Sequence, residues 1–371
     1  MDTRSKSDSA PTIYDVARRA GVSIASVSRV LNDRDNPRPV TRDKVMKAIA
    51  ELGFVPDGAA RALSSRLKHV VGVVFRRVYG TDDGGTFADE TESLLFGDQI
   101  NRGIEIAAGR RGFDLLVCSV NIDERTLPNR ILTIAGKCDG LILHDQVLST
   151  AGLETIARTT PVVTLAGQPG MDVANVRSES ADSMRELARH LVEDHGYRRL
   201  AYIAGHADSP DNVVRGRSFT EQAQSLGAEV LTGPAWQGDY SAAGGVEIVR
   251  GLISLGASLP RAIACANDQT ALGVIYALAE HGFDVPGDVA VTGFDDLPFA
   301  RHLRPQLTTV RQPIQEIGAR AFEVLHSMIT ADASSPAGPP AEIVLPTRIV
   351  RRESCGCPAE PTTPRLWRPI G

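Results

Sequence analysis

The chain has 371 residues and a formal net charge of −5, which is unevenly distributed along the sequence. Residues 1–68 contain 13 lysines and arginines against 8 aspartates and glutamates, a net charge of +5. The remaining residues contain 27 against 37, a net charge of −10. A basic head on an acidic body indicates a head that binds a polyanion and a body that does not.

The composition argues against a membrane protein. No run approaches the roughly 18 consecutive apolar residues that a membrane-spanning helix requires, so no membrane partner is expected. Residues 1–6 lack the apolar core of a secretion signal, and residues 1–10 are predicted to form a disordered arm. These features predict a cytoplasmic protein.

Residues 12–32 predict two short amphipathic helices that meet at Gly21. Thr12 can cap the first helix, and apolar residues between 13 and 20 recur at helical spacing. Ser23 can cap the second helix. The outward face of this second helix carries short side chains and one long cation: Ile24, Ala25, Ser26, Ser28 and Arg29. Such a face can approach base edges in a DNA major groove, so the pattern predicts a helix-turn-helix DNA reader.

A third helix is predicted from about Thr41 to Leu52, with Gly53 at its end. Residues 54–68 form a linker, in which Ala59 to Leu63 are good helix formers but too few to be helical alone. We expect this segment to be coil in the free protein and a hinge helix on DNA.

From Val70 onward, apolar strands alternate with helices. Strands are predicted at 70–75, 114–118, 140–143, 162–165, 200–204, 229–231, 262–266 and 289–292. Helices are predicted at about 98–111, 126–136, 181–195, 214–226, 240–255, 269–281 and 313–329. This alternation predicts parallel sheets covered by helices on both faces, in two similar subdomains with a ligand cleft between them.

No catalytic or metal-binding motif is evident. The chain has no dinucleotide fingerprint after its first strand, no phosphate loop and no nucleophile elbow. His190 and His195 are five residues apart and so do not share the zinc-binding face of an α-helix. Cys355 and Cys357 are too closely spaced for a usual zinc knuckle, and we predict no metal, no cofactor and no enzymatic activity.

The order of these elements resembles the lactose-repressor (LacI/GalR) family of transcription factors, from Thr12 to Cys357. The run Val22-Ser23-x-x-Ser26-Val27-Ser28-Arg29-Val30-Leu31-Asn32 is close to the signature of that family. The resemblance implies an all-α helix-turn-helix head plus an α/β type I periplasmic-binding-protein-like domain of two doubly wound lobes.

The resemblance also implies where the parts begin and end. The DNA-binding domain is expected at 11–53, the hinge linker at 54–68, the effector-binding and dimerisation domain at 69–350, and a tail at 351–371. Within the large domain, the N-lobe is expected at about 69–165 and 297–326, and the C-lobe at about 166–296 and 327–350.

On DNA, the resemblance assigns Ile24, Ala25 and Arg29 to base contacts. Arg29 can bond bidentately to a guanine, whereas Ile24 and Ala25 offer apolar contacts. Leu63 is expected to insert into the minor groove at the operator centre; simple helix packing is the alternative. The residues expected to contact phosphates are Thr12, Tyr14, Ser26, Ser28 and Asn32, and Ser23 completes the DNA-binding set. For Tyr14 the alternative is a core aromatic.

In the large domain, four residues match the ligand-facing positions of the family: Phe96, Arg215, Asn267 and Asp295. An aromatic plate, a forked cation, an amide and a carboxylate together suit a polyol. For Asn267 the alternative is that it caps the helix that begins at Gln269. Departures from the family pattern at Glu179-Ser180, at Ser218 and in the long acidic segment 79–93 leave the identity of the effector open.

The sequence therefore predicts a homodimeric repressor of carbohydrate-uptake or catabolic genes, which binds a palindromic double-stranded operator on the nucleoid and is switched by a sugar-like effector. One alternative is a regulator that responds to a nucleobase, a sugar phosphate or another small metabolite. The others are a soluble sugar-binding protein and a sugar-modifying or nucleotide-dependent enzyme.

Overall fold

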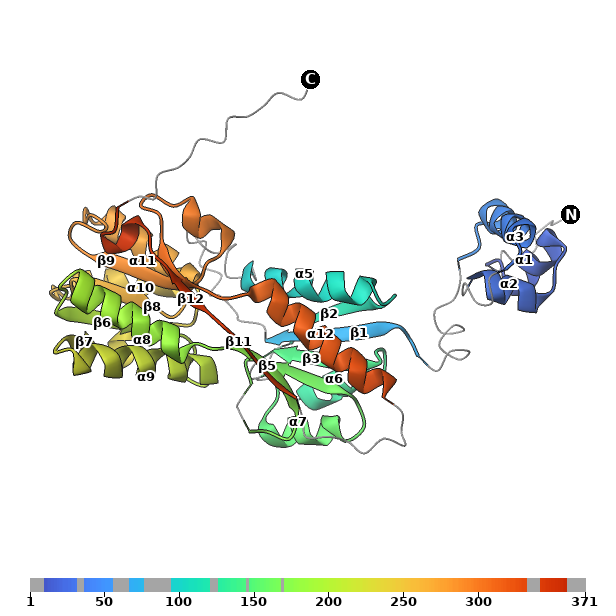
Figure 1. The fold of residues 1–371 in the computed structure, drawn as a ribbon, viewed down its shortest axis with the longest axis horizontal. Helices are drawn as coiled ribbons and strands as arrows, with labels where there is room; N and C mark the ends of the chain where they lie inside the picture. The colour runs from blue at the N-terminus through green and yellow to red at the C-terminus, as the bar shows by residue number, and fades with distance from the viewer. Residues whose placement is uncertain are drawn as a thin grey trace, which may run out of the picture. The chain divides into compact units, whose positions relative to one another are not determined.

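The computed structural model describes residues 10–31, 37–55, 67–76, 95–120, 126–144, 147–167, 170–331 and 341–358. The chain divides into two compact units, Met1–His69 and Val70–Gly371, drawn in Figure 1. Several predictions fall outside the described residues: most of the arm 1–10, Asn32, the hinge helix with Leu63, the segment 79–93, and the tail from 359 onward.

The first unit is a bundle of three helices: α1 (Ile13–Ala20), α2 (Ile24–Leu31) and α3 (Pro39–Leu52). Its core is small and formed by all three helices, with Val16, Val27 and Val45 at its centre. Gly21 ends α1 in the left-handed conformation (φ 66°), which glycine adopts at little cost. The predicted helix-turn-helix is confirmed, and α3 begins two residues earlier than predicted, with Pro39 in its first turn.

The second unit contains two six-stranded sheets (Figure 1). The first sheet is entirely parallel, in the order β11-β5-β4-β3-β1-β2. Its strands are β1 (Val70–Arg76), β2 (Asp114–Val120), β3 (Gly140–His144), β4 (Val162–Leu165), β5 (Ala174–Ser178) and β11 (Glu342–Leu345). The helices of this first lobe are α5 (Leu95–Gly109), α6 (Leu127–Ala135), α7 (Thr150–Ala157) and α12 (Ile314–Thr330).

The second sheet has the order β12-β10-β9-β8-β6-β7 and is parallel except for the pair β10–β12. Its strands are β6 (Arg199–Ile203), β7 (Glu229–Leu231), β8 (Ala262–Cys265), β9 (Ala290–Asp295), β10 (Thr308–Arg311) and β12 (Arg348–Val350). The main helices of this second lobe are α8 (Ala181–Arg189), α9 (Pro210–Ser225), α10 (Ala242–Ser254) and α11 (Asp268–Glu280). Four short helical turns complete the described chain: η1 (His190–Asp194), η2 (Pro234–Trp236), η3 (Pro298–Arg301) and η4 (Glu353–Cys355).

The points at which the chain crosses between lobes differ from those expected. The crossings lie at 179–180, 312–313 and 346–347, because β5 and β11 pair in the first sheet whereas β10 and β12 pair in the second. The expected boundaries at 165/166, 296/297 and 326/327 are therefore wrong. The predicted tail also begins too early, since η4 is packed against the second sheet through the fully buried Ser354.

Each lobe contains a pair of helices in unusually close contact. A Cβ added at Gly103 of α5 would lie 1.9 Å from the backbone oxygen of Gln315 in α12, and one added at Gly273 of α11 would lie 1.9 Å from the backbone oxygen of Ala242 in α10. Only glycine permits these approaches. Among the described helices, none is long and apolar enough to cross a membrane.

Candidate functional site

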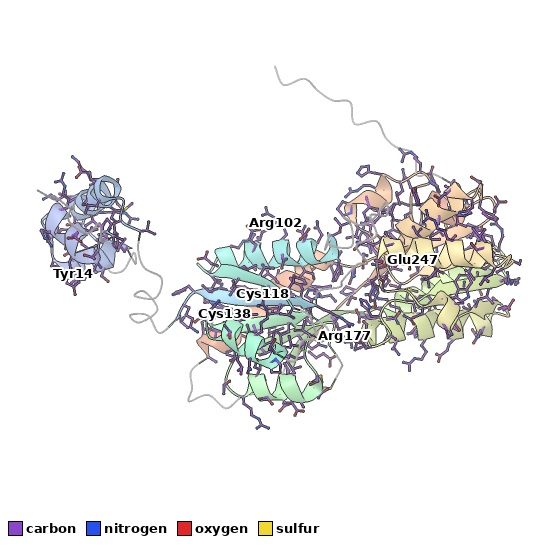
Figure 2. The ribbon with its side chains drawn as sticks, turned by 180° about the vertical axis from the view of Figure 1, so that it is seen from behind. Tyr14, Arg102, Cys118, Cys138, Arg177 and Glu247 are labelled. Atoms are coloured by element: carbon purple, nitrogen blue, oxygen red, sulfur yellow. The ribbon has the colours of Figure 1, made fainter. Side chains whose placement is uncertain are left out.

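The predicted DNA-contacting residues of the head that fall within 10–31 lie on its surface. Ile24, Ala25 and Arg29 are exposed on α2, as a base-reading helix requires, and Ser26 and Ser28 are half-buried. Tyr14 is 63% exposed on α1 (Figure 2), so the alternative that it is a core aromatic is wrong.

The two predicted helix caps are present in the head. The carboxylate of Asp15 accepts hydrogen bonds from the Thr12 backbone N–H (2.9 Å) and hydroxyl (2.6 Å). These hydrogen bonds from Thr12 lower the pKa of Asp15. The Oγ of Ser23 accepts from the backbone N–H of Ser26 at 3.1 Å and so caps α2. Both caps fix the geometry of the turn that presents the recognition helix.

In the second unit, an ion pair joins the carboxyl edges of the two sheets. Arg76 ends β1 of the first lobe, and its Nη1 lies 2.8 Å from Oδ2 of Asp208, which follows β6 of the second lobe. Ligands of open parallel sheets bind outside the carboxyl ends of strands. We therefore define the interlobe site by the residues at these two edges: Phe96, His144, Arg215, Asn267 and Asp295.

Arg215 is the buried cation of the interlobe site. It extends from α9, is 5% exposed, and its guanidinium lies 3.7 Å from the ring centre of Phe294. Its Nη1 donates to the Ala266 carbonyl at 2.9 Å and its Nη2 to the Asp211 carboxylate at 3.1 Å. Burial opposes the charged form, but the acidic groups around the guanidinium, Asp211 foremost and Asp295 among them, together raise the pKa of Arg215. Its buried Nε has no hydrogen-bond partner among the described residues.

Asp295 is the buried carboxylate of the site. It ends β9 at a φ of 124°, a strained conformation for any residue except glycine. Its Oδ1 accepts a hydrogen bond of 2.6 Å from Nε2 of Gln312. Burial raises the pKa of Asp295 to about 7, although the nearby positive charge of Arg215 lowers it. The fully buried Asp268 lies close enough to Asp295 for the two charges to repel, so its pKa, raised first by burial, is raised further by Asp295.

Asn267 caps α11. Its Oδ1 accepts from the Thr270 backbone N–H at 3.0 Å, and its Nδ2 donates to the Tyr240 carbonyl at 2.8 Å. The capping alternative is therefore confirmed, and a ligand contact by Asn267 stays a prediction.

Phe96 lies on the first lobe beside a histidine that the sequence analysis missed. The ring of His144 is 6.1 Å from that of Phe96, edge to face, and 4.1 Å from that of Phe75. Burial lowers the pKa of His144 to about 3, and its buried Nε2 has no hydrogen-bond partner among the described residues. Its position at the carboxyl end of β3, one residue beyond the predicted strand, was the available signal.

A second cluster of polar side chains lies in the second lobe, apart from the interlobe site. His190, His195, Cys355 and Cys357 bring one nitrogen or sulfur each within 4.8 Å of one another. These are the described side chains that could hold a metal ion together, and the sequence analysis predicted no metal there.

A helix-turn-helix head followed by two doubly wound lobes with buried polar residues at their facing edges defines a ligand-regulated DNA-binding protein. The family description "Bacterial regulatory proteins, lacI family" matches residues 12–57, and "Periplasmic binding protein-like domain" matches residues 188–355. The chain is 31% identical over 350 residues to catabolite control protein A of Priestia megaterium, covering 92% of this chain and 98% of that protein. It is 31% identical over 323 residues to the ribose operon repressor of Escherichia coli K12, covering 86% and 93%.

Solved structures agree with these relatives. A lac repressor dimer bound to operator and the anti-inducer ONPF has a TM-score of 0.76 at 26% identity, covering 94% of this chain and 99% of that one. A complex of the transcriptional regulator CelR with cellobiose has a TM-score of 0.65 at 28% identity, covering 93% and 99%. The chain belongs to the lacI family of bacterial regulatory proteins and is a transcriptional regulator.

Proposed function

We propose that this protein is a repressor of carbohydrate genes, which binds a near-palindromic operator as a homodimer and changes its operator affinity when a sugar-like effector binds the interlobe site. The observation that carries the effector proposal is the pair of buried charged side chains, Arg215 and Asp295, at the carboxyl edge of the second sheet. The unpartnered Nε of Arg215 can donate to a hydroxyl, and the carboxylate of Asp295 can accept from one. Phe96 supplies an aromatic face for the C–H side of a sugar ring.

The relatives support this choice of ligand and partner. One is named a ribose operon repressor, and the solved neighbours include a cellobiose complex and a dimer on operator DNA. A two-fold symmetric dimer presents its two recognition helices to two symmetric half-sites. In this proposal the bases of nucleoid DNA are read by Arg29, Ile24 and Ala25. The head is positioned on the DNA phosphate backbone by Thr12, Tyr14, Ser23, Ser26, Ser28 and Asn32. Leu63 inserts at the operator centre when its segment becomes helical on DNA.

The effector is identified by thermal shift, because a ligand that binds only the folded state raises the melting temperature. The purified protein is screened against pentoses, hexoses, disaccharides, sugar phosphates, nucleobases and small carboxylates. We expect one sugar or a narrow set of sugars to stabilise the protein. Stabilisation by a nucleobase or a phosphate alone would contradict the carbohydrate assignment while leaving the site in place.

The site itself is tested with Asp295→Asn, which keeps the shape of the side chain but removes its charge. The variant is expected to bind the identified effector at least about tenfold more weakly and to bind operator without effector as the wild type does. Arg250→Ala, which removes an exposed arginine of α10, is the matched control and should respond normally. A normal effector response in Asp295→Asn would contradict the interlobe assignment.

The DNA partner is tested by selecting duplexes from a random pool and measuring the mass of the complex. We expect an enriched sequence of two inverted half-sites and a complex of two chains on one duplex. Enrichment of a single unrepeated half-site, or a complex with one chain, would contradict the dimer.

A further inference from the structure

Two histidines and two cysteines from distant parts of the sequence meet in the second lobe. His190 begins η1, which continues α8, and His195 directly follows the last residue of η1. Cys355 ends the turn η4 after β12, and Cys357 lies two residues further on. The two pairs are separated by more than 150 residues in sequence, yet one ligand atom of each side chain lies within 4.8 Å of the other three. None of these side chains belongs to the DNA-binding surface or the interlobe site.

The histidines meet because η1 is a π-helix. In an α-helix, residues five apart point in different directions, which is why the sequence spacing argued against a shared face. In η1 the chain is wound more widely, and the backbone N–H of His195 donates to the carbonyl of His190 at 3.3 Å. Residues five apart are therefore aligned, and the two Nε2 atoms are 3.2 Å apart.

The cysteines meet the histidines because η4 is held in place on several sides. Gly356 adopts a φ of 100°, which turns the chain between the two cysteines. The hydroxyl of Tyr197 donates to the carbonyl of Cys355 at 3.0 Å, and Oγ of Ser354 donates to the carbonyl of Val291 at 2.6 Å. These bonds hold the backbone that carries Cys355 next to η1.

Four of the six distances among these atoms match the edges of a metal-centred tetrahedron, and all six are within 4.8 Å. Cys355 Sγ lies 3.4 Å from His190 Nε2, and Cys357 Sγ lies 3.6 Å from the Nε2 atoms of both His190 and His195. Bonds from zinc of about 2.0–2.1 Å to nitrogen and about 2.3 Å to sulfur give tetrahedral edges of about 3.3 Å between nitrogens and about 3.5 Å between nitrogen and sulfur. We propose that His190, His195, Cys355 and Cys357 bind one Zn²⁺ ion as a structural site.

The surroundings of the four side chains support a zinc site. Nδ1 of His190 lies 2.8 Å from Oδ2 of Asp194, so a carboxylate can hold that imidazole in the tautomer whose Nε2 lone pair faces the ion. The Thr308 hydroxyl donates to Sγ of Cys355 at 3.0 Å, a bond that stabilises a metal-bound thiolate. His195 stacks on Tyr197 with the rings 5.3 Å apart, which fixes its orientation.

The donor set and its burial indicate a structural role. Two imidazoles and two thiolates in a tetrahedral arrangement favour zinc over the harder magnesium and calcium ions. Four protein ligands leave no coordination position for a substrate. The ion would cross-link the end of η1 to the segment around η4 and so hold β12 against the second lobe. His190 and Cys355 are buried, whereas His195 and Cys357 are half-buried and give the ion a route from solvent.

The first test measures metal directly in the full-length protein, purified without a metal-affinity tag. Mass spectrometry of the elements is expected to find about one zinc per chain. Replacement by Co²⁺ is expected to give the visible d–d and thiolate charge-transfer bands of a tetrahedral Cys₂His₂ site. A protein that takes up neither ion at micromolar concentrations would overturn the proposal, as would a Cys355–Cys357 disulfide found in the freshly purified protein.

The second test uses variants. Cys357→Ser is expected to lose the cobalt charge-transfer intensity of one thiolate and most of the bound zinc, whereas Cys118→Ser, on β2 of the other lobe (Figure 2), should retain both. Asp194→Asn keeps all four ligands and is expected to weaken zinc binding about 10–100-fold, as measured by competition with a chromophoric chelator. Undiminished zinc in Cys357→Ser, or unchanged affinity in Asp194→Asn, would contradict this assignment. Operator binding by each variant verifies that it is folded.

Discussion

At the scale of single residues, the surroundings of Asp295 hold its carboxyl group in an unusual protonation state. Burial raises its pKa to about 7, and an unfolded aspartate titrates near pH 3.9. Between these two values the folded protein binds a proton that the unfolded chain does not. The stabilisation from this proton is therefore fully present below about pH 4 and is lost as the pH rises through about 7.

We expect Asp295→Asn to remove this pH dependence. Each unit of pKa difference corresponds to about 1.4 kcal/mol, so the free energy of unfolding of the variant should gain a few kcal/mol relative to the wild type between pH 4 and pH 8. Urea denaturation without effector at several pH values measures the difference. Parallel pH profiles for the two proteins would show that Asp295 is ionised throughout.

Arg29 is the residue whose role on DNA has the clearest energetic signature. Arg29→Ala is expected to weaken binding to the selected operator by about 1–3 kcal/mol per half-site, because a bidentate contact to guanine is lost. Arg29→Lys retains the charge but not the fork, so it should lose operator affinity while keeping affinity for a scrambled duplex. Titrations of both duplexes at one salt concentration measure this. Equal losses on the two duplexes would identify Arg29 as a phosphate contact.

Single residues also show how far the sequence could predict the site. Arg215, Asn267 and Asp295 can be proposed from the sequence because family motifs stand at strand ends and helix starts, which local patterns reveal. The contacts that set their chemistry could not be found in this way. The Phe294 ring beside Arg215 and the Phe75 ring beside His144 depend on packing between segments that are distant in sequence.

At the scale of elements, the predictions are confirmed for segments whose own apolar pattern is typical of a strand or a helix. The apolar strands and amphipathic helices predicted for the body are present, with ends shifted by no more than four residues when η1 is counted as the continuation of α8. The missed strands β5, β10, β11 and β12 are short, and β5 contains Asn175 and Arg177. These four strands lie next to the points where the chain crosses between lobes, so the sheet that each one joins depends on the path of the whole chain. The π-helix η1 was missed because the spacing of apolar residues does not distinguish a π-helical turn from an α-helical one.

The close contacts between helices predict that two glycine-to-alanine substitutions change the free energy of unfolding in opposite directions. Gly103→Ala places a Cβ against the backbone of α12, which cannot yield as a side chain can, and is expected to destabilise the protein by about 1–3 kcal/mol or more. Gly251→Ala, in the open on α10, meets nothing within 4 Å and should stabilise it by up to about 1 kcal/mol. Urea denaturation of both variants measures the difference. Destabilisation by the two changes alike would contradict the importance of the α5–α12 contact.

At the scale of the whole molecule, the ion pair between Arg76 and Asp208 links the two lobes of the effector domain. An effector that contacts both Phe96 and Arg215 requires the lobes to be close together. The pair is partly exposed, with side chains 25% and 49% accessible. It therefore stabilises the arrangement in which the two lobes are close together by about 0.2–1 kcal/mol.

We therefore expect Arg76→Ala to weaken effector binding by up to about fivefold at low salt. The difference from the wild type should shrink at high salt, because screening weakens the pair in the wild type as well. Arg250→Ala, which breaks another partly exposed pair, with Glu280 inside one lobe, should leave effector affinity unchanged. Isothermal titration calorimetry at two salt concentrations measures the effect. A salt-independent loss in Arg76→Ala would point to a direct contact with the ligand.

The three crossings between lobes have a consequence for biosynthesis. The first lobe lacks α12 and β11 until residue 345 has been made, and the second lobe lacks β12 and η4 until residue 355. Neither lobe can be completed while the C-terminal segment is still inside the ribosome, whereas the three-helix head is finished by residue 52. The head can thus fold first, whereas the two lobes can be completed only once residue 355 has left the ribosome. Until then their unpaired strand edges stay exposed to aggregation and to chaperones.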